Sequence, residues 1–165
     1  MPPHFPAATL AEPAPSPEAT GEFLHRFDIG ALRCLLPPET PAALALAGEI
    51  RRLPFSPPWF EGLTNYRSEI IPVFDLPRFL EAGQPPGRGR FLLVIGEKNS
   101  RAALRTDQVT TFPLPKAAKT ADDYAGPRAL QGFVIARYWR EEQPFLLIDP
   151  PRLLEAMRSP AAATA

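Results

Sequence analysis

The sequence predicts a mainly β fold made of two small five-stranded barrels. Its 165 residues include 23 prolines, which shorten helices and favour short strands joined by rigid turns. Two apolar runs, Ile71–Pro77 (IPVFDLP) and Phe145–Pro151 (FLLIDPP), are similar, and each leads into a predicted helix. This repeat indicates two related half-chains. Closing each sheet into a barrel would remove its exposed edges.

The composition is that of an ordinary globular protein, with 45% hydrophobic and 22% charged residues. Eighteen basic and 18 acidic residues leave no net charge, which argues against a nucleic-acid partner. No apolar run is long enough for a membrane span, and the N-terminus lacks signal-peptide features, so we expect a cytoplasmic protein without membrane insertion. The single cysteine, Cys34, lies in an apolar strand and is expected in the core.

We expect one ordered domain between two tails. Residues 1–21 are rich in proline and alanine and are predicted to form a disordered arm or a polyproline-type docking peptide. Residues 158–165 are predicted to be a tail. The domain at 22–157 would consist of two barrel subdomains, at about 22–82 and 90–157.

The first half is expected to contain five strands and a short helix. A hairpin turns at Gly30, which tolerates the conformation needed there. Pro72 predicts an edge strand or a bulge, and Asp75 is placed to cap the helix. The expected strands are 23–28, 31–36, 46–53, 63–67 and 70–74, with a helical turn at 42–47 and a helix at 76–82.

The second half is expected to repeat this outline. A continuous apolar run begins it, and Asp149 followed by two prolines precedes the last helix. The expected strands are 90–95, 102–106, 109–112, 130–136 and 144–148, with a loop at 137–143 and a helix at 152–158.

No catalytic or metal-binding constellation is found. His4 and His25 lack triad-like partners, and one cysteine with one ordered histidine cannot complete a metal site. No glycine-rich phosphate loop is present. We therefore expect no enzyme activity, cofactor or metal. Arg51 and Arg52, with Arg26 and Arg33, would form either a basic stripe or a solvated strand face.

The stretch Trp59–Leu76 (WFEGLTNYRSEIIPVFDL) resembles the CheW-like coupling proteins of bacterial chemotaxis. The resemblance implies two intertwined five-stranded barrels of SH3 type. It also implies a non-catalytic adaptor that couples the cytoplasmic tip of a chemoreceptor to the regulatory domain of a CheA-like histidine kinase, in chemotaxis or twitching motility. Ser68 and Gln108 replace glycines that the family usually has. The residues that carry the resemblance are Gly62, Leu63, Asn65, Arg67, Pro72, Val73, Asp75 and Leu76.

Five residues are candidates for partner binding. Glu49 and Arg67 are charges with apolar neighbours, so each should be paired or face a partner, and the resemblance implies neighbouring strands for them. Asn65 belongs to the same motif. The resemblance also implies an apolar receptor groove between the barrels that includes Phe91 and Phe112, although a core role fits either phenylalanine equally well.

An alternative function is a free-standing SH3-type module that binds proline-rich peptides. It requires an exposed aromatic cluster such as Trp59, Phe60 and Tyr66 in place of a groove between barrels.

Overall fold

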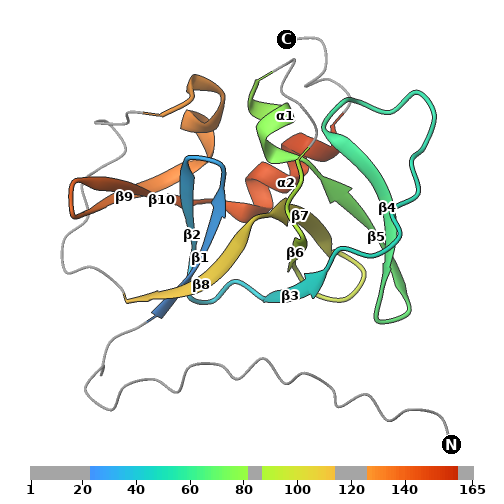
Figure 1. The fold of residues 1–165 in the computed structure, drawn as a ribbon, viewed down its shortest axis with the longest axis horizontal. Coiled ribbons are helices and arrows are strands. Elements are labelled where there is room, and N and C mark those ends of the chain that lie inside the picture. Colours follow the sequence, from blue (N-terminus) through green and yellow to red (C-terminus); the bar gives the residue numbers. More distant parts are fainter. Residues whose placement is uncertain (1–22, 82–86, 114–125, 160–165) are drawn as a thin grey trace, which may run out of the picture.

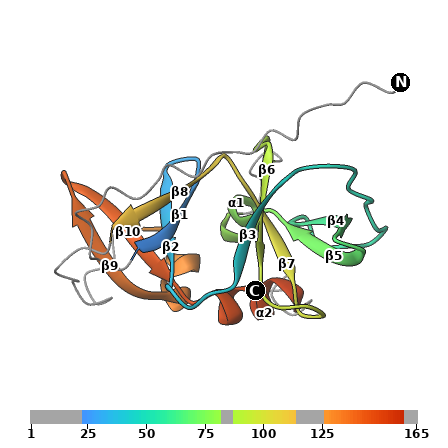
Figure 2. The ribbon, with the colours of Figure 1, turned by 90° about the horizontal axis from the view of Figure 1, so that it is seen from below.

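The computed structural model describes residues 23–81, 87–113 and 126–159. Figures 1 and 2 show two sheets side by side with two helices, α1 and α2, between them. The mainly β class predicted from the sequence is confirmed. The predicted arm at 1–21 and most of the predicted tail, 160–165, lie outside the described residues.

The two sheets have five strands each and share one topology. In each sheet an antiparallel hairpin is flanked on one side by an antiparallel edge strand and on the other by a parallel strand, which pairs with a second edge strand. The first sheet has the order β8(Gln108–Pro113), β1(Phe23–Ile29), β2(Leu32–Leu36), β10(Gln143–Ile148), β9(Val134–Arg140). The second has the order β3(Ala42–Leu46), β6(Phe91–Ile95), β7(Ala102–Thr106), β5(Glu69–Phe74), β4(Phe60–Tyr66).

The predicted division of the strands into consecutive halves needs correction. All of β3 to β7 lie in the second sheet, whereas the first combines β1 and β2 with β8, β9 and β10. The reason is that the N-terminal hairpin pairs with β8 and β10 and not with the strands that follow it. The sheets are therefore intertwined, as the family resemblance implied.

The predicted closed barrels also need correction. Among the described residues, no backbone ladder joins β8 to β9 or β3 to β4, so each sheet is open between its edge strands. In the second sheet the chain after β3 runs between these edges. It contacts the sheet backbone through the bond from Ala47 N to Arg90 O and a bridge between Arg51 and Leu63.

The two similar sequence segments occupy equivalent positions in the two sheets. One forms β5 and α1 (Leu76–Leu80), and the other forms β10 and α2 (Pro150–Arg158). Asp75 caps α1 by accepting the Arg78 amide at 3.1 Å, and Asp149 caps α2 by accepting the Arg152 amide at 3.2 Å. The Asp75 cap was predicted and is confirmed, and the predicted start of the last helix after Asp149 is confirmed as well, because an aspartate before prolines suits the first turn of a helix.

Several predicted element boundaries differ from the structure. The Ala/Leu run at 42–46 is strand β3 and not a helical turn, because its five residues pair with β6 and tertiary pairing overrides helix propensity. Residues 47–53 form only the one bridge of Arg51 and are not a strand. In the last hairpin, the 3₁₀ helix η2 (Arg128–Phe133) precedes β9, and the turn lies at Glu141 and Glu142.

Pro72 does not mark an edge strand, since β5 lies between β7 and β4. Only Val73 and Phe74 of β5 pair with β7. Pro72, which has no N–H group to donate, therefore precedes the paired residues and interrupts no hydrogen bond of that ladder. A register shift does occur in the β4–β5 pair, but between Phe60 and Gly62.

The main core fills the space between the two sheets and the helices. Trp59 is 7% exposed there, and its indole Nε1 donates to the Met157 carbonyl at 2.9 Å. The ring also meets Phe79 edge to face, with ring centroids 5.4 Å apart. Cys34 is fully buried in this core, as predicted. The motif stretch is thus fixed to the C-terminal helix. No helix in the described part of the chain is long and apolar enough to cross a membrane.

Candidate functional site: an apolar groove between two edge strands

The opening between β3 and β4 forms a groove of about 500 Å³ on the second sheet. We call it the β3–β4 groove. One wall is the segment after β3, which is held to β4 by two backbone bonds between Arg51 and Leu63 of 2.8 and 2.9 Å. The Thr64 hydroxyl adds a bond to the Glu49 carbonyl at 2.8 Å. The lining includes Ala45, Leu46, Glu49, Asn65, Tyr66 and Ile70.

Large apolar side chains are exposed around this groove. Leu46 is 73% exposed and Ile70 is 71% exposed, and Leu53 is exposed as well. Fully burying a side chain of this size is worth about 1.5–3 kcal/mol. Such an exposed apolar surface beside polar groups is typical of a protein–protein contact.

Two predicted site residues, Glu49 and Asn65, lie in the lining of the groove. The Glu49 carboxylate is exposed and accepts from the Arg51 guanidinium, with Nε and Oε1 3.3 Å apart. Because both side chains are largely in water, this pair contributes little to stability and is available to a partner.

Glu49 and Arg67, each expected to be paired or to face a partner, are not paired with each other. Arg67 is in the two-residue turn between β4 and β5, where it has φ 48° and the following Ser68 has φ 65°. Its guanidinium stacks on the Tyr66 ring, 5.2 Å from the centroid, and Arg101 stacks on the same ring at 5.5 Å. The turn places the Arg67 side chain on the ring of the adjacent Tyr66, while Glu49 pairs with Arg51. The role of Arg67 in partner binding stays a prediction.

The two predicted phenylalanines lie outside the β3–β4 groove. Phe91 begins β6 opposite Leu46 and is half-buried. Phe112 belongs to the first sheet, is 3% exposed and stacks with Phe145 at a centroid distance of 4.5 Å. The roles of Phe91 and Phe112 in partner binding stay predictions.

A second opening lies between the two sheets and has a volume of about 710 Å³. We call it the inter-sheet cleft. Its lining comes from the β2–β3 connection, the end of β6, β9 and α2, and includes Pro41, Ile95, Ile135 and Leu154. Ile135 is 51% exposed. Neither Phe91 nor Phe112 lines this cleft.

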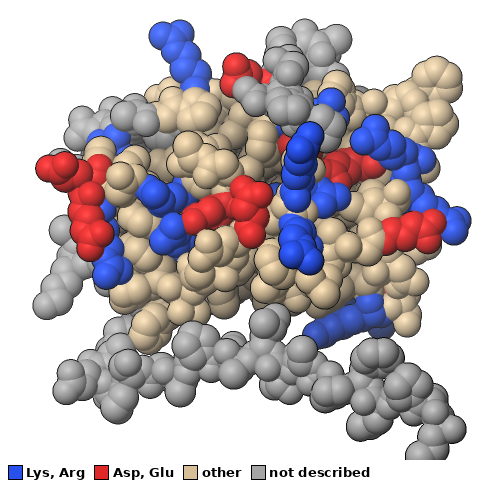
Figure 3. Space-filling model, in the orientation of Figure 1, with Lys and Arg blue, Asp and Glu red and all other residues tan. Residues whose placement is uncertain are grey.

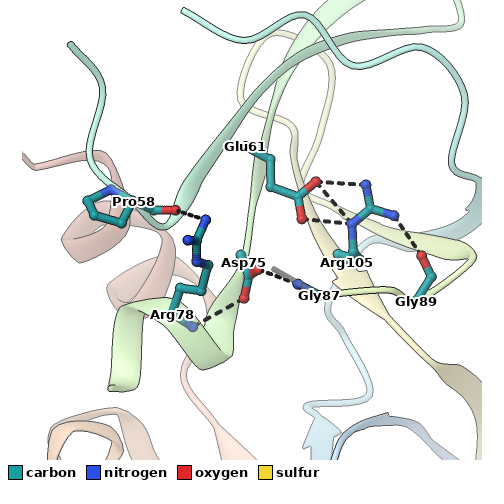
Figure 4. A network of polar contacts seen from close by, with 7 residues as sticks. All are labelled: Pro58, Glu61, Asp75, Arg78, Gly87, Gly89 and Arg105. Carbon is teal, nitrogen blue, oxygen red and sulfur yellow. Dashed lines mark hydrogen bonds and ion pairs between the residues drawn. The ribbon is translucent and has the colours of Figure 1, made fainter. Parts of the chain in front are cut away.

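A partly buried polar network joins strands of the second sheet (Figure 4). Glu61 of β4 accepts two bonds of 2.7 Å from Arg105 of β7, and Arg105 also donates to the Gly89 carbonyl at 2.6 Å. Asp75 accepts the Gly87 amide at 2.8 Å as well as capping α1. These charge-assisted bonds connect four segments of the second sheet.

The surface charges are mixed. On the face drawn in Figure 3, acidic and basic side chains alternate with neutral ones. Arg26 and Arg33 lie on β1 and β2, whereas Arg51 and Arg52 precede β4, so these residues do not form a continuous basic stripe. Within the described ranges, no group of three or more potential ligands is arranged to hold a metal ion.

The aromatic cluster that the alternative function requires is not exposed. Trp59 is buried against α2 and Phe79, Phe60 is half-buried and packs on Phe74, and Tyr66 lies under two guanidiniums. An SH3-type surface for proline-rich peptides needs exposed rings, so this arrangement does not supply it.

A family model described as CheW-like domain matches residues 27–158 of the chain. The chain belongs to the CheW-like family. Protein FrzA from Myxococcus xanthus is 36% identical over 77 residues, which are 47% of this chain and 48% of that protein. The chain thus matches about half the length of this relative. The crystal structure of the scaffolding protein TtCheW from Thermoanaerobacter tengcongensis superposes with a TM-score of 0.65 at 19% identity, covering 78% of this chain and 89% of that one. This similarity supports the fold.

The sequence reasoning missed the exposed apolar residues of this CheW-like protein. Ile70 and Ile71 are adjacent in a strand, and neighbouring residues of a strand point to opposite faces. One of them must therefore be exposed unless both faces are covered, and this was the available signal for Ile70. Leu46 was missed because it was expected at the junction of a helical turn and a strand at 46–53, and it ends strand β3 instead.

Proposed function

We propose that this CheW-like protein is a non-catalytic coupling scaffold of a bacterial chemosensory assembly. In this role it binds the regulatory domain of a CheA-like histidine kinase and the cytoplasmic tip of a chemoreceptor. The match of the CheW-like model to residues 27–158 is the observation that carries the proposal. Similarity to FrzA and to the scaffolding protein TtCheW supports it.

A scaffold that joins two partners needs two separate surfaces, and the chain offers two. We assign the kinase domain to the β3–β4 groove, where Leu46 and Ile70 present exposed apolar area beside Glu49 and Asn65. We assign the receptor to the inter-sheet cleft, where Ile135 is half-exposed. Burying these side chains at an interface would contribute to affinity, with the charged groups setting specificity.

The test uses two matched isoleucine variants in a reconstituted assembly of receptor, kinase and this protein. Ile70→Glu should weaken binding to the kinase domain and leave receptor binding unchanged, and Ile135→Glu should do the reverse, because each places a charge at one surface only. Binding is measured by pull-down, and coupling by receptor-dependent phosphorylation of the kinase. The protein alone should show no phosphotransfer. Normal coupling by both variants would contradict the two-surface proposal.

A further inference from the structure

The shared topology gives each sheet an opening between its edge strands. In the second sheet this opening is the β3–β4 groove, with an apolar rim. The equivalent opening of the first sheet lies between β8 and β9 and is a pocket of about 350 Å³, near the lower end of the usual range for ligand pockets. We call it the arginine pocket. It is lined by Arg26, Arg33, Phe112, Arg140, Glu141, Gln143 and Phe145.

The floor of the arginine pocket is aromatic and its walls are cationic. Phe112 and Phe145 stack at 4.5 Å. The guanidiniums of Arg26 and Arg33 lie 5.2 and 5.9 Å from the Phe145 centroid, and that of Arg140 lies 5.6 Å from the Phe112 centroid. A guanidinium that stacks on a ring keeps its in-plane N–H groups available for hydrogen bonds.

The three arginines differ in how many of their donors are already used. Arg26 gives Nε and Nη2 to the Asp28 carboxylate at 2.8 and 2.6 Å, and this hydrogen bonding raises the pKa of Arg26. Arg33 gives Nη1 to the Gln143 side chain. The Arg140 guanidinium lies over the Phe112 ring, and it makes no side-chain hydrogen bond or ion pair within the described part of the chain. Its guanidinium carries five N–H donors, and it lines the pocket together with Glu141 and Gln143.

The charges indicate what kind of anion fits. Arg26, Arg33 and Arg140 are opposed by the carboxylates of Asp28 and Glu141, which leaves an excess of one positive charge. A single carboxylate would neutralise this excess. A phosphate dianion would exceed it and would be repelled by Glu141.

From this arrangement we propose that the arginine pocket binds a side-chain carboxylate from an acidic segment of a partner protein. Arg140 and the free donors of Arg33 bind the carboxylate above the buried Phe112 and Phe145 rings. This inference rests on the proposed role as a coupling scaffold, and it adds a third contact surface with a defined chemistry.

The experiment is an NMR titration of the full chain with a blocked hexapeptide that alternates glutamate and leucine. Shifts should appear in β1, β2 and the β9–β10 hairpin, and Arg140→Gln should weaken binding about tenfold, because it removes a charge-assisted contact. Arg152→Gln, an exposed arginine on α2, is the matched control and should bind normally. A peptide with glutamine in place of glutamate should not shift these residues.

Three results would overturn the proposal: unchanged binding by Arg140→Gln, equal binding of the glutamine peptide, or tighter binding of inorganic phosphate than of the glutamate peptide. The outcome is separable from that of the proposed function. If receptor and kinase coupling is normal but Arg140→Gln binds the peptide as tightly as the unchanged protein, only the pocket assignment fails. If the peptide binds through Arg140 but no coupling is found with the receptor and kinase, only the scaffold proposal fails.

Discussion

Glu61 and Arg105 form a bidentate ion pair that connects β4 to β7, with side chains only 10% and 18% exposed. Hydrogen bonding to Glu61 raises the pKa of the Arg105 guanidinium. Removal of either partner leaves the other charge poorly solvated, so Glu61→Gln or Arg105→Met should each lower the free energy of unfolding by about 2–4 kcal/mol. Denaturant unfolding measures the loss.

A double-mutant cycle gives the sharper result. Glu61 and Arg105 should show a coupling energy of about 1 kcal/mol or more, because they share hydrogen bonds. The same cycle for Glu49 and Arg67 is the control and should be additive within about 0.5 kcal/mol, since these side chains contact other residues. A coupled Glu49–Arg67 pair beside an uncoupled Glu61–Arg105 pair would contradict the structure.

This contrast shows what the sequence could and could not predict. Local patterns predicted the class, the N-cap Asp75, the start of the last helix after Asp149 and the repeated strand–helix segment, because caps and alternation depend on neighbouring residues. Glu49 and Arg67 were singled out as charges that should be paired or face a partner because both have apolar neighbours, and Glu61 and Arg105 were not. The partner of a charged side chain depends, however, on the order of the strands in the sheet. In the second sheet β5 lies between β7 and β4, and local sequence patterns do not reveal this order.

The same limit explains the errors in strand assignment. Ala42–Leu46 has helical propensity, and only the distant β6 makes it a strand. Arg26 and Arg33 were grouped with Arg51 and Arg52 by residue type. Pairing of β1 with β8 instead brings Arg26 and Phe112 to one pocket, from segments separated by most of the domain.

Ser68→Gly should stabilise the protein. Ser68 has φ 65° in the β4–β5 turn, and a left-handed conformation costs a non-glycine residue about 1 kcal/mol. Part of this gain is lost to the larger entropy of glycine in the unfolded chain, so we expect a net increase of about 0.5 kcal/mol in the free energy of unfolding. Ser159→Gly is the control, because Ser159 has φ −83° and gains nothing. A loss of stability in Ser68→Gly would exclude the left-handed turn.

Gly62→Ala should be strongly destabilising. Gly62 has φ 145°, and an added Cβ would lie 2.2 Å from the Arg51 carbonyl oxygen, which is backbone and has little freedom to move. The bridge that forms the groove wall must then break, at a cost of about 3 kcal/mol or more. Gly48→Ala is the control, since its Cβ would meet nothing within 4 Å. Similar melting temperatures for the two variants would mean that Arg51 does not approach β4 this closely.

The C-terminal helix should be essential for stability. Leu153 is fully buried in the core between the sheets, on the same helix as Met157, whose carbonyl accepts the Trp59 indole bond. Leu153→Ala should cost about 2–5 kcal/mol through lost burial and the cavity left behind. Glu155→Ala, on the exposed face of the same helix, should change stability by less than about 0.5 kcal/mol. Equal effects would show that α2 is not docked on this core.

Cys34 should resist thiol reagents until the protein unfolds. Burial, with a smaller contribution from Asp28, raises the pKa of the thiol from 9.0 to about 12, so the reactive thiolate is scarce in the folded state.

The raised pKa of Cys34 also makes the free energy of unfolding depend on pH. Between pH 9 and pH 12 the unfolded thiol ionises while the folded thiol keeps its proton, so this group favours unfolding as the pH rises through that range and has no effect below it. Cys34→Ala should remove that part of the alkaline stability loss, which is measured by comparing urea unfolding of the two proteins at pH 8 and pH 10. Rapid labelling of the native protein at pH 8, at a rate independent of urea, would show that the thiol is exposed and would contradict its place in the core.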